Sequence, residues 1–224
     1  MQVDILSLFP DYFQGPFDVS IVERAQEKGL LAINLVDIRK FATGKHAKVD
    51  DRPYGGGPGM VLKPEPVCAA IRSVRRDGSH VVYLSPQGKR LNAEKCRELA
   101  QRKHLILLCG HYEGVDERVM KEVDEEISIG DFVLPNGCGA AVLLLEATVR
   151  LLPGVLGNAE SALQDSFQQS GLFDAPCYTQ PEEFEGTKVP SVLKSGNHAA
   201  IAEWKKERAR EKTARVRPDL IEGV

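Results

Sequence analysis

The chain has 224 residues, with 29 Lys and Arg against 32 Asp and Glu, a formal net charge of −3. This length can bury a sizeable core in one or two domains, and 42% hydrophobic residues is an ordinary content for a soluble globular protein. The first residues lack the basic segment of a secretory signal, and Glu146 and Arg150 interrupt the longest apolar stretch, 140–152. We therefore expect a cytoplasmic protein without a membrane span.

The number and spacing of the cysteines and histidines indicate whether disulfides or a metal site are expected. The five cysteines are odd in number and form no Cys-x-x-Cys pair, which is typical of reduced, buried thiols. The five histidines lack the spacing of a structural zinc site. The sequence predicts neither a disulfide framework nor a structural metal.

The first three-quarters of the chain alternates short apolar runs with helical patterns. Runs of this kind are typical of strands in a parallel sheet that is buried on both faces. The predicted strands are 3–9, 31–38, 80–84, 105–109 and 126–129. The predicted helices are 19–28, 64–76, 92–103 and 140–152. Asn92 is the expected N-cap of the third helix, and the fourth is apolar on almost every side, which indicates burial in a core or between subunits.

After Gly157, roughly twenty residues rich in Ser, Gln, Asp and Pro indicate a linker. The class is therefore α/β with a helical C-terminal domain: we expect an α/β domain over 1–157, a linker over 158–177, and a helical domain over 178–224 with a basic helix at 199–214. Between Lys194 and Arg217, eight Lys and Arg stand against three Glu, so this segment carries +5 and the rest of the chain −8. Such a helix is either a solvated face with internal ion pairs or a surface that contacts phosphates.

A glycine cluster occupies 52–60, with the sequence Arg-Pro-Tyr-Gly-Gly-Gly-Pro-Gly-Met. Because glycine loses much conformational freedom on folding, the cluster indicates a sharp turn that a ligand approaches closely, or else a flexible surface loop. The cluster matches neither a P-loop, which ends in Gly-Lys-Ser/Thr, nor a dinucleotide fingerprint, which would need glycine at position 60.

Three more loops contain glycine and follow the third, fourth and fifth predicted strands, at 84–88, 109–118 and 128–137. Open α/β sheets bind ligands at the carboxyl ends of their strands. The three loops therefore predict one pocket that is assembled largely from backbone.

At these loops the chain resembles the TrmD family of bacterial tRNA (guanine-N1)-methyltransferases, knotted enzymes of the SPOUT class that modify the guanosine 3′ of the anticodon. The resemblance runs nearly end to end. It includes 5–10 (Ile-Leu-Ser-Leu-Phe-Pro), the glycine cluster with the preceding Val-Asp-Asp, 110–118, 129–134, 150–157 (Arg-Leu-Leu-Pro-Gly-Val-Leu-Gly), 165–167 (Asp-Ser-Phe) and 193–198 (Leu-Lys-Ser-Gly-Asn-His). It implies a SPOUT-type parallel sheet with a deep trefoil knot, a small helical C-terminal domain and a homodimer.

The resemblance also implies tRNA as substrate and S-adenosylmethionine as methyl donor, with Mg²⁺ as a further candidate cofactor. It assigns to the donor Tyr83, Leu84, Ser85, Pro86, Gly110, Tyr112, Glu113, Ile129, Gly130, Asp131, Phe132, Val133, Leu134 and Gly137. The positive charge of the C-terminal segment assigns Lys205, Lys206, Arg208 and Arg210 to tRNA phosphates, and Arg52 and Gly56 of the glycine cluster are further candidate tRNA-binding residues. Glycines suit a donor site because backbone groups read adenine and ribose only where the main chain comes close. The alternative role of Glu113 is an acid at the start of a helix over 115–122.

Methylation at N1 of guanine requires removal of the N1 proton, so the site needs a base near N1 and a cation or donor near O6. The resemblance matches Asp165 to the base and Arg150 to the residue that stabilises O6. The alternatives are a linker Asp that makes a turn and an arginine in an ordinary ion pair.

One segment departs from the family pattern. The family usually continues Val-Leu with Gly-Gly-Glu-Leu-Pro-Ala-Met, whereas here Leu134 is followed by Pro-Asn-Gly-Cys-Gly-Ala-Ala-Val. An acidic group and a rigid proline are thus missing, so either the donor binds more weakly or the protein is a non-catalytic tRNA-binding factor. The presence of Glu113, Arg150 and Asp165 favours the enzyme.

A third hypothesis is ribose 2′-O-methylation of another RNA, which needs no base for a ring nitrogen.

Overall fold

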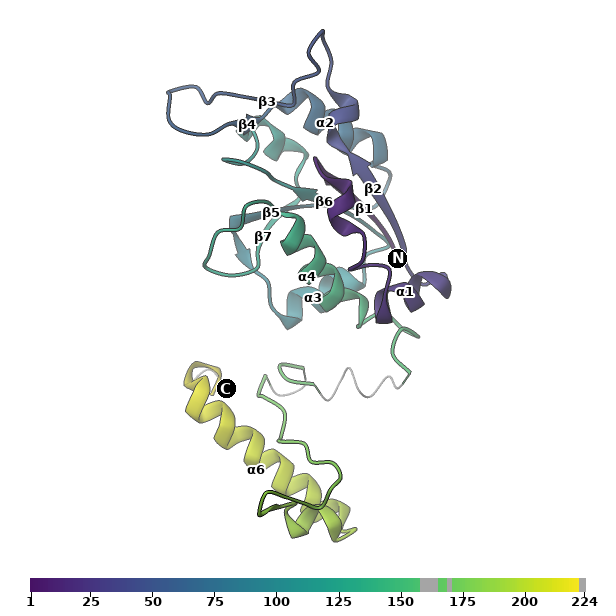
Figure 1. The fold of residues 1–224 in the computed structure, drawn as a ribbon, viewed down its shortest axis with the longest axis vertical. Coiled ribbons are helices and arrows are strands. Elements are labelled where there is room, and N and C mark those ends of the chain that lie inside the picture. Colours follow the sequence, from purple (N-terminus) through teal and green to yellow (C-terminus); the bar gives the residue numbers. More distant parts are fainter. Residues whose placement is uncertain (158–164, 169–170, 222–224) are drawn as a thin grey trace. The chain divides into compact units, whose positions relative to one another are not determined.

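A computed structural model describes residues 1–157, 165–168 and 171–221 (Figure 1). The chain divides into two compact units, Met1–Gly157 and Asn158–Val224. A five-stranded sheet in the order β2-β1-β6-β5-β7 forms the centre of the first unit, and all of its pairs are parallel. Its strands are β1 (Gln2–Ser7), β2 (Ala32–Asp37), β5 (Ser79–Arg90), β6 (His104–Cys109) and β7 (Glu125–Ser128). The predicted α/β class with a parallel sheet is confirmed.

The helices of the first unit cover both faces of this sheet. They are α1 (Ser20–Glu27), α2 (Pro64–Val74), α3 (Ala93–Ala100) and α4 (Cys138–Val149). Side chains alternate along each strand: Val3 and Ile5 pack in one core with α1, α3 and α4, whereas Leu6 packs with α2 on the other face. The central strands β1 and β6 are therefore buried on both faces, as predicted, whereas the edge strand β2 is largely exposed, with Leu35 38% exposed.

The helix ends agree with the sequence to within a few residues. The Asn92 side chain accepts a hydrogen bond from the Lys95 N–H at 2.8 Å, as expected of an N-cap. Helix α4 begins two residues before the predicted position and is mostly buried, but the Leu143 side chain is 53% exposed. This helix therefore presents one apolar position to the surface of the unit.

Strand β5 differs from the prediction. A strand over 80–84 followed by a loop was expected, but β5 continues to Arg90, and its pairing with β7 shifts register between Leu84 and Lys89. Gly88 lies in this irregular segment, where an added Cβ would collide with the backbone of Ile127. The second half of the expected loop is thus a bulged strand, because its backbone packs directly on β7.

The described part of the second unit consists of the long helix α6 (His198–Val216), a short hairpin of β8 (Glu183–Phe184) and β9 (Thr187–Lys188), and two 3-10 turns, Ser191–Lys194 and Pro218–Leu220. Asn197 caps α6 by accepting the Ala200 N–H at 3.1 Å. Within the described part, Thr213 alone is fully buried, and its hydroxyl accepts the Phe173 N–H at 3.0 Å. This unit is therefore held by polar contacts more than by an apolar core.

Much of the predicted linker, at 158–164 and 169–170, lies outside the described residues. Within the part of the chain that the structure describes, no helix is both long and apolar enough to span a bilayer.

Candidate ligand-binding site

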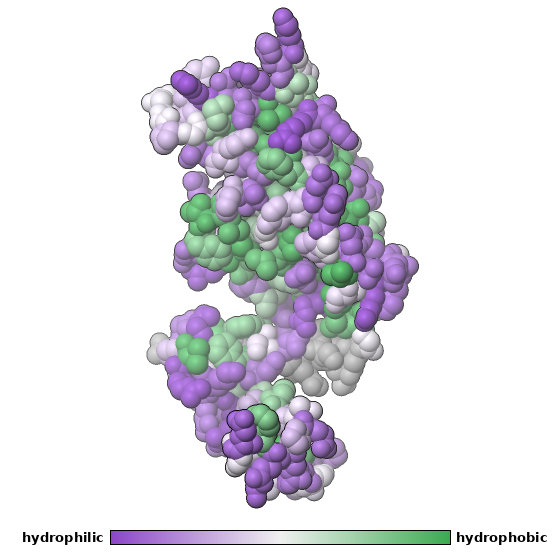
Figure 2. Space-filling model, in the orientation of Figure 1, coloured by the Kyte–Doolittle hydropathy of each residue, from purple (hydrophilic) through white to green (hydrophobic). Residues whose placement is uncertain are grey.

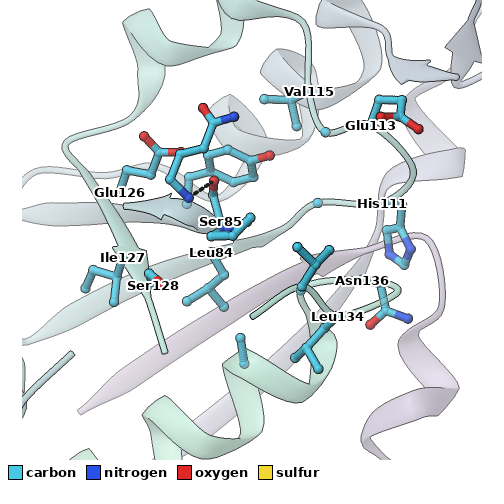
Figure 3. A pocket seen from close by; sticks show the side chains of 18 of the residues that line it. Leu84, Ser85, His111, Glu113, Val115, Glu126, Ile127, Ser128, Leu134 and Asn136 are labelled. Carbon is cyan, nitrogen blue, oxygen red and sulfur yellow. Dashed lines mark hydrogen bonds between the residues drawn. The ribbon is translucent and has the colours of Figure 1, made fainter. Parts of the chain in front are cut away.

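A cavity of about 530 Å³ lies at the carboxyl ends of β5, β6 and β7, which are adjacent in the sheet (Figure 3). Its walls come from the end of the regular part of β5, from the loop after β6, and from the loop between β7 and α4. Sites for small ligands typically measure about 300–1,000 Å³. The edge of the sheet that the sequence singled out therefore carries a cavity of ligand size.

The residues that the resemblance assigns to the donor gather around this cavity, with two exceptions. Its lining includes Tyr83, Leu84, Ser85, Pro86, Gly110, Tyr112, Glu113, Ile129, Phe132, Val133, Leu134 and Gly137. Gly130 and Asp131 are not among the lining residues. The Asp131 carboxylate instead pairs with the guanidinium of Arg90 at 2.6 Å, so this side chain is turned to the far part of β5.

Tyr83 supports the loop that follows β6. Its side chain is buried, and its hydroxyl accepts a hydrogen bond from the Val115 N–H. Burial raises the pKa of Tyr83, so the phenol is neutral near pH 7. A Cβ added at Gly110 would lie 2.9 Å from the phenolic oxygen. The loop can therefore lie over Tyr83 because position 110 has no side chain.

His111 and Asn136 lie in the predicted loops 109–118 and 128–137, but neither residue was predicted to belong to the site. Both line the cavity and form an isolated antiparallel bridge with each other, and Figure 3 shows them side by side. His111 is only 4% exposed, and the Asn136 side chain accepts the Cys138 N–H at 2.9 Å. The asparagine thus caps the first turn of α4. Each of the two residues lies next to a glycine in a loop at the end of a strand, and this position is the feature of the sequence that indicates a place in the site.

The glycine cluster is tied to the same loop. Two short strands, β3 (Asp50–Asp51) and β4 (Val61–Leu62), hold its ends together. The Met60 carbonyl accepts the Glu113 N–H at 3.0 Å, and the Leu62 N–H donates to the Gly114 carbonyl at 3.0 Å. Arg52 and Gly56 are exposed in the loop between these strands. Residues assigned to tRNA therefore lie on a loop whose base contacts the cavity wall.

The two residues assigned to catalysis belong to different units. Arg150 lies at the C-terminal end of α4 in the first unit and is half-buried. Asp165 lies at a turn of the second unit, where its carbonyl accepts the Gln168 N–H at 3.2 Å. Each unit is described by itself, so the roles of these two residues stay predictions.

On α6, three of the basic residues assigned to tRNA, Lys205, Lys206 and Arg210, are exposed. Arg208 is half-buried, and its guanidinium pairs with Glu211 at 2.7 Å and with Glu207 at 3.1 Å. The helix therefore combines both expected features, internal ion pairs and an exposed basic surface.

No group of three or more His, Cys, Asp or Glu that could hold a metal ion occurs among residues 1–157, 165–168 and 171–221. The described residues therefore do not form a Mg²⁺ site of that kind.

A parallel sheet with a cavity built from three adjacent strand-end segments is typical of α/β proteins that bind a small ligand at the carboxyl edge. The particular family follows from comparison with known proteins. The family model described as tRNA (Guanine-1)-methyltransferase TrmD matches residues 1–223, and the chain belongs to this family. The family membership inferred from the sequence motifs is confirmed.

Individual relatives carry the same name. A tRNA (guanine-N(1)-)-methyltransferase of Protochlamydia amoebophila is 63% identical over 99% of this chain and 100% of its own length. The protein so named from Chlamydia pneumoniae is 57% identical over 98% of this chain, which covers 61% of that relative. A third, from Dictyoglomus turgidum, is 50% identical over 99% of this chain and 90% of its own length.

Proposed function

We propose that this protein is an enzyme that transfers a methyl group from S-adenosylmethionine to N1 of guanosine 37 in tRNA, next to the anticodon. The observation that carries the proposal is the cavity at the ends of β5, β6 and β7, in a chain that belongs to the TrmD family over almost its whole length. Because tRNA is the substrate, the enzyme would act in the cytoplasm.

The lining of the cavity fits the donor. Peptide groups of 84–86 and 110–114 can hydrogen-bond adenine and ribose, while Phe132, Val133 and Leu134 offer apolar contact. These three side chains are 39–81% exposed, so a ligand in the cavity would bury apolar surface. The donor, when bound, supplies an electrophilic methyl group on a sulfonium; the cavity residues hold and orient it and keep water away from it.

Methylation of the guanine acceptor requires further catalytic groups from the protein. We assign to Asp165 the removal of the proton from guanine N1, which frees the ring lone pair for attack. We assign to Arg150 the stabilisation of the negative charge that develops at O6 as this proton leaves. The glycine-cluster loop, with Arg52 and Gly56, and the exposed basic face of α6 would position the tRNA.

We further propose that the strand-end loops form a trefoil knot and that two copies of the chain make a homodimer. Family membership supports the knot, since true knots are very rare. Exposed apolar side chains support the dimer: Tyr12, Leu134 and Leu143 are 49%, 39% and 53% exposed. A Cβ at Gly139 would lie 3.4 Å from the Tyr12 hydroxyl and 3.6 Å from Leu134, which places both beside α4.

Figure 2 shows apolar surface gathered over the segment between β7 and α4. Patches of this kind on a protein surface typically mark an interaction site. A second copy that covers this patch would bring an Asp165 to the cavity of its partner across a two-fold axis.

Complementation tests this shared site. Two inactive variants, Asp165→Ala and the cavity-blocking Gly110→Trp, are mixed under conditions that exchange subunits. Each mixed dimer then contains one intact cavity served by one intact Asp165. Random exchange makes about half the dimers mixed and restores about a quarter of the wild-type sites. No recovery after verified exchange would show that each chain carries its own complete site.

Mass spectrometry of nucleosides tests the reaction itself. An unmodified tRNA transcript with guanosine at position 37 is incubated with the protein and the donor, then digested. We expect 1-methylguanosine, and its loss when position 37 is changed to adenosine. A 2′-O-methyl nucleoside in its place would mean ribose methylation, and absence of both products together with no heat in a donor titration would mean a non-catalytic tRNA-binding protein.

A further inference from the structure

Two buried cysteines lie next to each other, each beside a glycine that lines the cavity. Cys109 is the last residue of β6, and Cys138 is the first residue of α4. The antiparallel bridge between His111 and Asn136 sets the register of the two segments, and the Gly137 N–H donates to the Gly110 carbonyl at 2.8 Å. Cys109 directly precedes Gly110 and Cys138 directly follows Gly137, so the two cysteines adjoin this contact.

The two segments are close enough for a disulfide. A Cβ added at Gly137 would lie 3.0 Å from the Cα of Cys109. Cys138 directly follows Gly137 in the chain, so the two cysteines lie side by side, and disulfides span Cα–Cα distances of about 4.4–6.8 Å. The thiols of Cys109 and Cys138 also contact each other.

The surroundings of the two thiols are unequal. The Cys138 Sγ lies 3.2 Å from the Ser7 Oγ and 4.0 Å from the His111 Nε2. Hydrogen bonds from the Cys109 thiol first, and then from His111 and Ser7, lower the pKa of Cys138 to about 5, although burial opposes them. Burial raises the pKa of Cys109 well above its usual value. One sulfur is therefore suited to attack as a thiolate and the other to follow as a thiol.

We propose that Cys109 and Cys138 form a redox-active dithiol that hydrogen peroxide converts to a disulfide, linking two walls of the ligand cavity. The Cys138 sulfur attacks one peroxide oxygen, the O–O bond breaks, and water leaves with a sulfenic acid formed on Cys138. The Cys109 sulfur then attacks the sulfenic sulfur, the S–O bond breaks, and a second water leaves as the S–S bond forms. The two thiols lose two electrons and the peroxide gains them.

The cavity offers the route to this site. Both thiols are fully buried, but each cysteine is the chain neighbour of a residue that lines the cavity, Gly110 beside Cys109 and Gly137 beside Cys138. A disulfide would withdraw the Cys138 sulfur from His111 and Ser7 and join the loop after β6 to α4. The effect on the donor rests on the function proposed above, and we expect the oxidised protein to bind S-adenosylmethionine about tenfold more weakly.

Peptide mapping tests the dithiol without any donor. The reduced full-length protein is treated with hydrogen peroxide, alkylated in denaturant and digested with trypsin, which places the two cysteines on separate peptides, 104–118 and 122–150. We expect one linked peptide pair that has lost two hydrogens and that a dithiol reductant separates. Cys109→Ser and Cys138→Ser should each abolish the link. Cys96→Ser is the matched control, because Cys96 is also buried but its thiol hydrogen-bonds Thr148.

Titration with S-adenosylmethionine then compares reduced protein, oxidised protein and peroxide-treated Cys138→Ser. We expect weaker binding only in the oxidised wild type, with circular dichroism confirming that all three are folded. Absence of the link in folded wild-type protein, equal linking of Cys109 to the exposed Cys177, or a link without a change in donor affinity would each overturn the inference. Failure of the reduced protein to bind the donor would overturn the proposed function. It would not affect the test of the dithiol, because the peptide map requires no donor.

Discussion

The two units of the chain are held together in different ways. The first buries side chains on both faces of a sheet, and residues such as Ile5, Leu107 and Leu144 are 0% exposed. In the described part of the second unit, Thr213 alone is fully buried. Its aromatic pairs, Phe167 with Phe173 and Tyr178 with Trp204, have ring centroids 5.5 and 6.3 Å apart and include exposed rings.

This difference indicates a division of tasks. A cavity walled by elements of a packed core keeps its shape without a ligand, which reduces the cost of binding a small donor. A unit with little apolar core and a basic helix gains stability mainly from what it binds. The second unit is therefore suited to a large polyanion such as tRNA.

Replacing Asp165 by Asn should lower the single-turnover rate of N1 methylation by about 10²- to 10⁴-fold, because the proton acceptor is removed. Donor affinity should not change, since the cavity lining is untouched. Asp174→Asn is the matched control, an exposed carboxylate of the same unit. Equal rates in the two variants would remove Asp165 from the chemistry and leave the second unit with a binding role only.

Leu144→Ala should destabilise the first unit by about 2–5 kcal/mol, because it leaves a cavity in the core beneath α4. The half-buried Leu193 of the second unit is the counterpart, and Leu193→Ala should cost about 1 kcal/mol or less. Urea denaturation followed by circular dichroism measures both. Similar losses would show that the second unit has a core of comparable importance.

Changing Lys205, Lys206, Arg208 and Arg210 together to Gln should weaken tRNA binding and leave donor binding unchanged. The slope of log K against log salt should become shallower by about 0.7–0.9 for each phosphate that the variant no longer neutralises. Binding measured over a series of salt concentrations tests this. An unchanged slope would show that α6 is a solvated helix that does not contact phosphates.

Single variants sharpen the same prediction. Arg208 already pairs with Glu207 and Glu211, whereas Arg210 is exposed. Arg210→Gln should therefore weaken tRNA binding more than Arg208→Gln, because a guanidinium engaged by carboxylates is less available to phosphate. The reverse order would mean that the tRNA breaks these ion pairs and uses Arg208 directly.

The smallest effects concern the helix caps. Asn92→Ala and Asn197→Ala should each cost about 1 kcal/mol, because each leaves a helical N–H without its acceptor. In the first unit the loss should appear in global stability. In the second it should appear as lower helicity of α6 without a shift of the first unit's transition. A shift of both transitions by Asn197→Ala would show that the two units unfold together.

Features that depend on local pattern could be predicted from the amino-acid sequence. Continuous apolar runs identified the buried strands β1 and β6, a single side chain identified the cap at Asn92, and long motifs identified the family. The sequence also indicated which strand ends carry the cavity, because parallel strands leave their carboxyl ends on one edge of a sheet. The roles of Arg150 and Asp165 and the tRNA-binding residues stay predictions.

Contacts between segments that are far apart in the sequence are seen only in the tertiary structure. It continued β5 past the expected loop because Gly88 packs on β7, and it turned Asp131 toward Arg90 and out of the cavity lining. It also placed Cys138 beside Cys109, because Gly137 packs against the Cys109 backbone. Periodicity and caps act over a few residues and can be read along the chain. The register between segments far apart in sequence depends instead on which packing fills the core, and that is settled only in three dimensions.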